Sequence, residues 1–196
     1  MRPLPLLATL LAAFLIAGCA STVSPLYTNS DAVADPAIVG TWVGGDKDNQ
    51  GTVHVSKEDN GSYQVTVHSK DSDDDAVYET HLVKLGSASY ADLRLTDYRH
   101  AGKHVDLPLG TVSLHEIVKY QVTGDDLAVS VIGGDEFEKA AKQPGFPLQF
   151  RDTKEGTGSE AGGDTVILSS TADLRRYFSA HPADIFGEVE DLKRQH

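Results

Sequence analysis

The chain has little cysteine, few basic residues and no long hydrophobic run. One Cys among 196 residues excludes an internal disulfide and any cysteine-rich zinc site. With 17 Lys and Arg against 29 Asp and Glu, the net charge is −12. This charge excludes non-specific binding of nucleic acid, because phosphates need clustered cations. The remaining composition, 40% hydrophobic and 23% charged, is that of a soluble globular protein, and the length indicates one domain.

The main apolar run covers residues 4–17, directly after a short positive start at Met1-Arg2-Pro3. A helix of this length is too short to cross a hydrocarbon core of about 30 Å, but the run fits the central segment of a secretory signal peptide. It ends in Ile16-Ala17-Gly18-Cys19, an aliphatic residue, two small residues and the single Cys. This tetrapeptide resembles the lipobox of bacterial lipoproteins.

The lipobox resemblance implies cleavage between Gly18 and Cys19, attachment of diacylglycerol to the Cys19 thiol, and acylation of the new N-terminus by a fatty acid such as palmitate. Several acyl chains on one residue form a stable membrane anchor. Ala20 follows where Asp would indicate inner-membrane retention, so the resemblance implies the periplasmic face of the outer membrane in a Gram-negative cell. The alternative is a plain signal peptide. Removal of residues 1–18, which carry one Arg and no acid, takes the charge from −12 to −13.

The mature chain divides into two parts. Residues 20–37 are small, polar and interrupted by Pro, and this composition predicts a tether between membrane and domain. Residues 38–196 then form the single folded domain. From residue 38 to residue 132 apolar residues mostly alternate with polar ones, which predicts about seven strands in an antiparallel meander. Asn60-Gly61 is a strong hairpin signal between two of them.

The last third of the chain no longer shows the alternation of apolar and polar residues. Residues 135–142 begin with acids and end with Lys, the charge order that a helix dipole prefers. Residues 153–163 read as a flexible loop and residues 165–168 as a short strand. Ser170 and Asp173 resemble a capping box before a second helix. The terminal residues 182–196 favour a short third helix.

Gly40-Thr41-Trp42 opens the first predicted strand of the domain. It resembles the Gly-x-Trp motif of lipocalins and related calycin barrels. That resemblance implies that Trp42 closes one end of a barrel and packs on a basic side chain from the C-terminal part, for which Arg151 and Arg175 are candidates. The alternative is a single core Trp after a turn glycine.

The wider layout is similar to a group of uncharacterised bacterial lipoproteins. The resemblance rests on the lipobox and on four later segments, which are residues 24–27, 39–42, 81–85 and 168–178. It spans most of the mature chain and implies no particular activity.

Candidate metal and cofactor motifs fail on their spacing. The acidic segment 71–75 resembles a calcium loop, but Ala76 and Leu82 stand where Gly and Glu are required. His100 and His104, with Asp97 and Asp106 nearby, lie in a segment that favours a loop over a helical zinc site. The dinucleotide-like spelling at 156–161 is followed by more Gly instead of a helix. The sequence therefore nominates no cofactor and no metal.

Four further histidines fall on predicted strands. His54 and His68 alternate with Val, which indicates that they face solvent or a polar lumen, and His115 falls on a later strand. His81 shares a face with Val83 and Leu85, which favours a buried, hydrogen-bonded side chain over a pocket position.

Together these features predict a mainly β protein, an antiparallel lipocalin-like barrel or curved sheet with one or two short helices in the C-terminal third. We expect a non-enzymatic cell-envelope lipoprotein whose barrel binds a small apolar ligand, because a barrel of about eight strands can hold one. The alternative is an envelope interaction module with a filled core and a protein partner. A hydrolase assembled from scattered His and Asp is a third hypothesis.

Overall fold

The computed structural model describes residues 20–28, 30, 33–45, 50–69, 73–106, 113–152 and 165–196. The described residues form mostly strands, together with two short helices and one 3-10 turn. In chain order the elements are β1 (Ala20–Thr22), η1 (Pro36–Ile38), β2 (Gly40–Gly44), β3 (Gly51–Lys57), β4 (Tyr63–Ser69), β5 (Asp74–Leu85), β6 (Ala88–His100), β7 (Lys103–His104), β8 (His115–Thr123), β9 (Asp126–Val131), α2 (Gly134–Ala141), β10 (Phe150–Asp152), β11 (Thr165–Ile167), α3 (Thr171–Ala180) and β12 (Glu190–Arg194).

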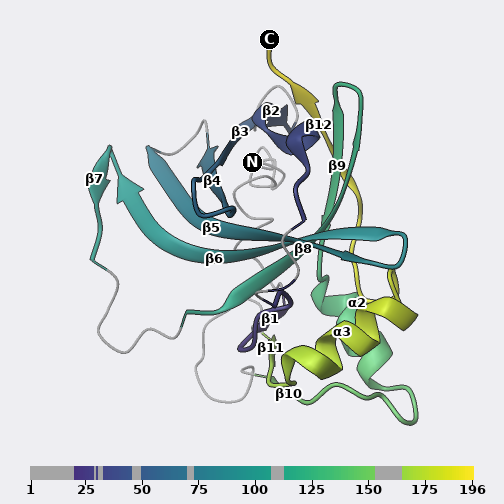
Figure 1. Cartoon of the computed structure of the whole chain (residues 1–196). Helices are drawn as coiled ribbons and strands as arrows, with labels where there is room; N and C mark the ends of the chain where they lie inside the picture. The colour runs from purple at the N-terminus through teal and green to yellow at the C-terminus, as the bar shows by residue number, and fades with distance from the viewer. Residues whose placement is uncertain are drawn as a thin grey trace, which may run out of the picture.

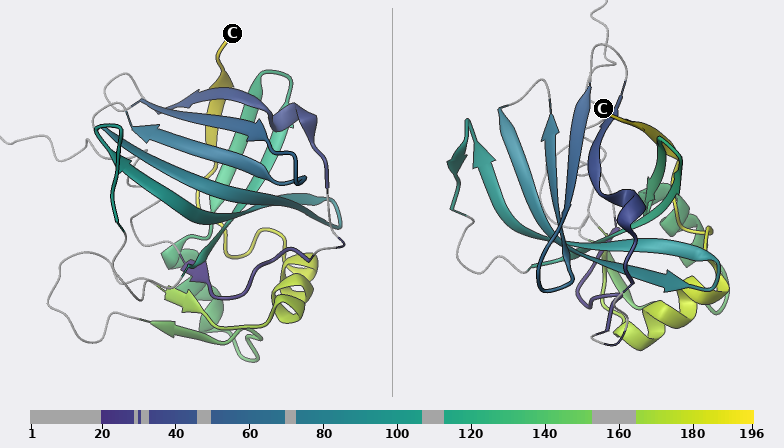
Figure 2. Two further views of the ribbon diagram at one scale, coloured as in Figure 1. Left: turned by 60° about the vertical axis from the view of Figure 1, so that its left-hand side comes forward. Right: turned by 45° about the horizontal axis from the view of Figure 1, so that its top comes forward.

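Eight antiparallel strands close into a barrel in the order β2, β3, β4, β5, β6, β8, β9 and β12 (Figures 1 and 2). The mainly β, barrel-forming expectation is therefore confirmed. Residues 89–94 of β6 pair with β8, whereas Arg99 and His100 pair with β7. Because β6 changes partner along its length, its second half extends past the contact with β8 and carries β7 at its edge, while the start of β5 stays paired with β4 (Figure 1).

The C-terminal residues are a strand, so the prediction of a terminal helix within 182–196 is wrong. β12 pairs antiparallel with β9 on one side and with β2 on the other. Leu192 is 2% exposed and belongs to the apolar cluster inside the barrel. Glu, Leu, Lys and Arg have good helix propensity, but two open strand edges supply hydrogen bonds on both sides of this segment and outweigh that preference.

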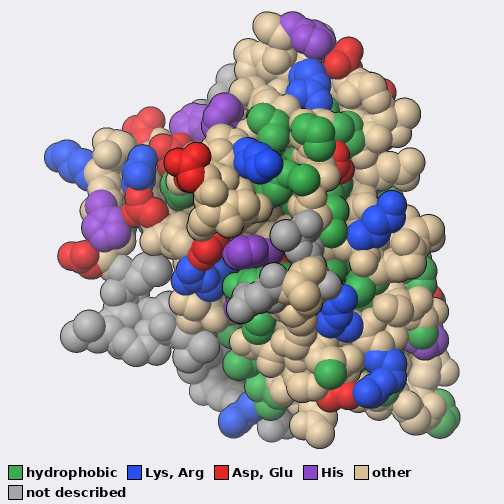
Figure 3. Space-filling view, viewed as in Figure 1, with side chains coloured by type: hydrophobic (Ala, Val, Ile, Leu, Met, Phe, Trp, Pro, Cys, Tyr) green, Lys and Arg blue, Asp and Glu red, His purple; other side chains and the backbone are tan. Residues whose placement is uncertain are grey.

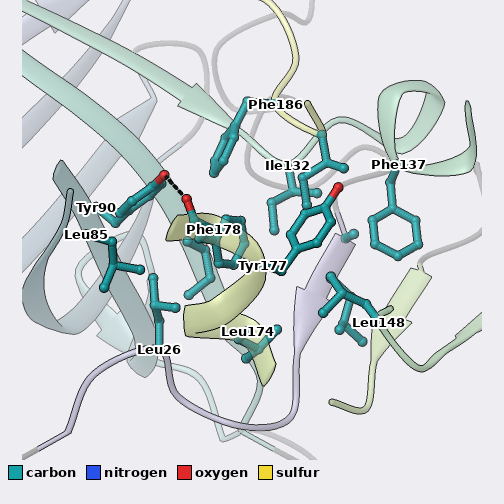
Figure 4. Packing of buried hydrophobic residues seen from close by; sticks show 14 of the residues in the cluster. Leu26, Leu85, Tyr90, Ile132, Phe137, Leu148, Leu174, Tyr177, Phe178 and Phe186 are labelled. Atoms are coloured by element: carbon teal, nitrogen blue, oxygen red, sulfur yellow. Dashed lines mark hydrogen bonds between the residues drawn. The ribbon is translucent and has the colours of Figure 1, made fainter. Parts of the chain in front are cut away.

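The excursion between β9 and β12 builds a second layer on the outer wall of the barrel. α2, α3, β10 and β11 lie there together with β1, at the pole opposite the C-terminus (Figures 1 and 2). They enclose a core separate from the barrel interior (Figure 4). Its aromatic and aliphatic members include Leu26, Tyr90, Phe137, Leu174, Tyr177 and Phe178.

The hairpin turn and the helix cap that the sequence predicted are both present in the structure. Gly61 has φ +87°, which suits the turn after Asn60, and the Asn60 side chain accepts a hydrogen bond from the Ser62 N–H at 2.9 Å. The predicted helices are α2 and α3. Ser170 caps α3 by accepting the Asp173 N–H at 3.3 Å.

The described residues of 20–37 pack on the domain and are not a free tether. Ala20–Thr22 forms β1, parallel to β11. Leu26 is fully buried in the second core, and its carbonyl accepts the Arg175 Nη1 at 3.1 Å. The Pro25 carbonyl accepts the Thr171 hydroxyl at 2.7 Å. We call residues 20–28 the N-terminal strap. Its polar composition suggested a linker, but one buried Leu and hydrogen bonds from α3 side chains to its carbonyls hold it in place.

Candidate functional site

The barrel interior is an apolar lumen with unfilled space. Alternation along each strand points every second residue inward, and these positions are Val, Leu, Ala or Tyr almost throughout. The lumen holds a cavity of about 110 Å³. Its lining consists of Ile38, Val53, Val55, Tyr63, Val65, Val67, Thr80, Leu82, Ala91, Leu93, Val118, Tyr120, Leu127, Val129, Val131, Glu190 and Leu192. Such a surface favours an apolar occupant over water.

Two polar side chains line the same cavity without closing a polar network. Thr80 is 1% exposed, and its hydroxyl has no hydrogen-bond partner within the described residues. A buried hydroxyl without a partner costs about 1–3 kcal/mol, so this position favours a group that supplies one. Glu190 also lines the cavity, and burial raises the pKa of its carboxyl. The lumen therefore combines an aliphatic wall with a small number of hydrogen-bonding groups.

A second carboxyl lies on the lumen face of β8. Glu116 alternates with Val118 and Tyr120, which belong to the inner cluster. Burial raises the pKa of Glu116 from its ordinary 4.5 to about 7. The pKa of Tyr78 is also raised, mainly by burial and further by the charge of Glu116. Glu116 therefore changes charge close to neutral pH.

Glu116→Gln is expected to stabilise the protein at pH 8 and to leave its stability unchanged at pH 4.5. The folded state holds the Glu116 proton more tightly than the unfolded state, so wild-type stability falls as the pH rises from 4.5 through 7. The loss amounts to at most about 3 kcal/mol, at about 1.4 kcal/mol per pH unit. Urea denaturation at the two pH values measures the difference. The contribution of Glu190 to the pH dependence cancels in this comparison, because both proteins contain it. An equal difference at pH 4.5 and pH 8 would contradict the prediction.

Trp42 and Arg194 close one end of the barrel. Trp42 is fully buried, and its Nε1–H donates to the Ile38 carbonyl at 2.8 Å. The Arg194 guanidinium carbon lies 4.1 Å from the centre of the Trp42 ring. The Arg194 Nη1 and Nη2 donate to the carbonyls of Val39 and Ala37, both at 2.7 Å. The Arg194 side chain is 21% exposed. A cation over an indole face contributes about 0.5–2 kcal/mol depending on its exposure, so the pair stabilises the contact between the first and last barrel strands.

The basic partner of Trp42 is thus Arg194, and neither Arg151 nor Arg175, which were the candidates from the sequence. Arg151 is exposed on β10, and Arg175 donates to the strap. The expectation missed Arg194 because residues 182–196 were assigned to a helix. Gly40 lies directly below the guanidinium: it has φ +141°, and a Cβ there would come within 2.5 Å of the Arg194 Nη1. The position therefore requires Gly.

Residues just before β2 seal the same end. The Asp35 N–H donates to the Tyr63 hydroxyl at 3.0 Å, and the Tyr120 hydroxyl donates to the Asp35 Oδ2 at 3.1 Å. Burial, together with the Asp35 charge, raises the pKa of Tyr120. Both tyrosine hydroxyls are therefore used by the seal, and their rings face the cavity.

A buried His–Asp pair lies on the outer wall, under the N-terminal strap. Asp92 on β6 is 1% exposed, and its Oδ1 lies 2.6 Å from the Nδ1 of His115 on β8. The other oxygen, Oδ2, accepts the Leu26 N–H at 2.5 Å. Both oxygens of Asp92 are therefore occupied by contacts that hold the strap to the barrel.

His81 lies beside this pair and also contacts the strap. Its ring stacks on the Tyr27 ring, with the ring centres 3.8 Å apart and the planes 18° from parallel. Its Nε2 lies 3.5 Å from the Glu79 Oε1. His81 shares the outer face with Val83 and Leu85 and does not line the lumen cavity, but its side chain is 29% exposed, so the prediction of a buried His81 is wrong.

The remaining predicted histidines are exposed and contact neighbouring side chains. His54 contacts Thr41, and His68 contacts Asp75. His100, at the end of β6, contacts Asp74, whereas His104 in β7 contacts both Asp97 and Asp106. Figure 3 shows acidic, basic and His side chains intermixed over this part of the sheet. Within the described ranges, no group of three or more His, Cys, Asp or Glu residues is arranged to hold a metal ion.

Several predicted features lie outside the described residues. These are Gly18, Cys19 and the rest of residues 1–19, the whole loop 153–163 with its segment 156–161, and residues 71 and 72 of the acidic run. Among the helices that the structure describes, none is long and apolar enough to cross a membrane. Comparisons with protein-family models, with curated proteins and with solved structures gave no match, so the proposal of function rests on the residues and geometry described above.

Proposed function

We propose that this chain is a cell-envelope lipoprotein that carries lipid on Cys19 and binds a small apolar molecule in its barrel without catalysis. The observation that supports it best is the aliphatic cavity of about 110 Å³ inside the closed barrel. The lipobox at residues 16–19 supports the anchor, and in a Gram-negative cell Ala20 favours the periplasmic face of the outer membrane.

The cavity size limits the ligand. Drug-sized pockets have volumes of about 300–1,000 Å³, whereas an engineered apolar cavity of about 150 Å³ in another protein binds benzene. A cavity of about 110 Å³ therefore suits a molecule close to benzene in size, and a long acyl chain would require the lumen to expand. The Thr80 hydroxyl favours a ligand that carries one hydrogen-bonding group.

The outer His–Asp pair supports a binding role over a hydrolytic one. A catalytic His needs an orienting carboxylate and a free path to substrate. In this chain the Asp92 carboxylate also binds the backbone of the strap, and His115 is 7% exposed.

Native mass spectrometry of residues 20–196, purified gently, tests for a resident ligand, and thermal denaturation with added benzene or butanol tests for uptake. Ala91→Phe places a ring into the lumen and is expected to abolish the ligand-induced rise in Tm. Ala128 lies on β9 between Leu127 and Val129, which line the lumen, so its side chain is on the outer face of the barrel. Ala128→Phe is therefore the control and should retain the ligand-induced rise in Tm. Thr80→Val keeps the side-chain volume and removes the hydroxyl. Benzene should therefore still raise the Tm of this variant, whereas the rise caused by butanol should be smaller than in the wild type.

No extra mass and no Tm rise in the wild type would overturn the ligand-binding proposal. The barrel would then be a filled core, as many small barrels are. An envelope interaction module with a protein partner would become the leading function.

A further inference from the structure

Two carboxyl groups face the apolar lumen of the barrel. Glu190 on β12 lines the cavity itself. Glu116 on β8 lies next to the cavity wall, because Val118, two residues along the strand, and Leu93, its register partner on β6, both line the cavity. None of the described residues that line the cavity is Lys, Arg or His. Arg194, at the sealed end, donates to backbone carbonyls. The described lining therefore carries acidic groups and no counter-cation.

Each of these carboxyl groups loses hydration without gaining a partner of opposite charge. Burial is the only influence that moves the pKa of Glu190, and it raises that pKa. Burial alone also raises the pKa of Glu116, to about 7. A cation nearby would lower both pKa values, because opposite charge favours the ionised carboxylate. A positively charged occupant of the lumen would recover part of the free energy that desolvation of these groups costs, whereas an anionic occupant would be repelled.

The Thr80 hydroxyl points to a ligand independently of these charges. Thr80 is 1% exposed and lines the same cavity as Glu190, and its Oγ1 has no hydrogen-bond partner in the part of the chain that the structure describes. It also shares a row of the lumen wall with Glu116, because both are register partners of Leu93. Neighbouring strands are about 4.8 Å apart, so the Cα atoms of Thr80 and Glu116 are separated by about 10 Å. The hydroxyl can accept a hydrogen bond from a donor held among the carboxylates.

We propose that the lumen selects a small apolar primary amine, whose ammonium group pairs with Glu190 and donates a hydrogen bond to the Thr80 hydroxyl. This inference rests on the proposed function, because it names the chemical class of the ligand for the same cavity. An ammonium group has three N–H donors, so one group can serve both the carboxylate and the hydroxyl. The apolar part of the amine occupies the aliphatic cavity of about 110 Å³. Glu116 adds a second negative charge that attracts cations to the lumen.

Three four-carbon compounds that differ only in their polar end test the proposal. Butylamine, butanol and butyrate are added to the full chain in phosphatidylcholine vesicles at pH 8, where the amine is protonated and Glu116 is ionised. Unfolding is followed by the fluorescence of Trp42, the only Trp, and the concentration dependence of Tm gives an apparent Kd. Butylamine should bind about tenfold more tightly than butanol, because its hydrogen bonds are charge-assisted. Butyrate should not raise the Tm.

Glu190→Gln keeps the shape of the side chain and removes its charge. The apparent Kd of butylamine should rise about tenfold in this variant, to that of butanol. Butanol binding should be retained, which shows that the lumen is intact. Asp191→Asn is the matched control, because Asp191 is the next residue on β12 and carries the same charge, but its side chain is exposed on the outer face. This variant should keep the preference for butylamine.

Binding of butanol as tight as that of butylamine in the wild type would overturn the amine proposal and leave the ligand-binding function standing. If none of the three compounds raised the Tm, both proposals would be overturned. A preference for butylamine that survives in Glu190→Gln would also overturn the amine proposal, because another charge would then hold the ammonium group. The same conclusion would follow from an equal loss of preference in Asp191→Asn, since that result indicates attraction to the outer surface.

Discussion

Cys19→Ala is expected to abolish acylation and to release the folded domain from the membrane fraction. The lipobox places the only thiol of the chain at the end of the only apolar leader, and no other residue offers a site for the thioether. A buried methylene contributes about 0.8 kcal/mol to membrane binding, so loss of several acyl chains removes essentially all of the attachment. The domain should remain folded, because the strap contacts from Ala20 to Leu26 are present in the variant as well.

Incorporation of labelled palmitate and the mass of the N-terminal peptide measure this result, with circular dichroism as the test of folding. Ser21→Ala, two residues away and on β1, is the matched control and should remain acylated. A Cys19→Ala protein that still incorporates palmitate would show that Cys19 is not the acylation site, and a wild-type protein that incorporates none would show that the chain is not a lipoprotein.

Asp92→Ala is expected to cost about 3–5 kcal/mol of folding stability and to free the N-terminal strap. The substitution leaves the Nδ1 of His115 and the N–H of Leu26 without their acceptor in a buried place. A loss of this size is a large fraction of the 5–15 kcal/mol that stabilises a typical domain. The strap should open first at Leu26, because Asp92 accepts the Leu26 N–H, and Leu26 would then lose its place in the second core, whereas Thr22 keeps its pairing with His115 of β8.

Urea denaturation gives the stability change, and hydrogen exchange at Leu26 and Tyr27 reports the strap. Asp75→Ala is the matched control, because Asp75 also contacts a His, but on the exposed surface. Exposed pairs contribute about 0–1 kcal/mol. Equal losses in the two variants, or unchanged exchange at Leu26 in Asp92→Ala, would contradict the structural role of the buried pair.

A firmly held strap changes the mechanics of the proposed anchor. A flexible tether would let the barrel sample many orientations, whereas the strap is held on the sheet from Ala20 onward. In the proposed lipoprotein the Asp92–His115 pair would therefore hold the strap, and the strap would hold the barrel close to its anchor.

The period-two alternation between residues 38 and 132 predicted the barrel wall correctly, because side-chain direction along a strand is a local property. The Asn60-Gly61 turn and the Ser170 cap were also predictable, since their hydrogen bonds join residues close in sequence. Gly40 and Trp42 marked the start of β2 for the same reason.

Three features of the site depended on contacts between distant segments and were not predictable. Arg194 meets Trp42 only because β12 fills the gap between β9 and β2. Asp92 and His115 face each other through the pairing of β6 with β8. The strap looked like a linker because its binding energy comes from partners more than 60 residues away.

The amino-acid sequence by itself determined the strand pattern, the turns and caps, the acidic surface and the lipobox, because each of these depends on neighbouring residues or on composition. The tertiary structure decided the closure of the barrel, the empty volume in its lumen, the partner of Trp42 and the packing of the strap against α3. These follow from which strand edges and apolar faces find each other across the chain, and that is settled only when all of them must be satisfied at once.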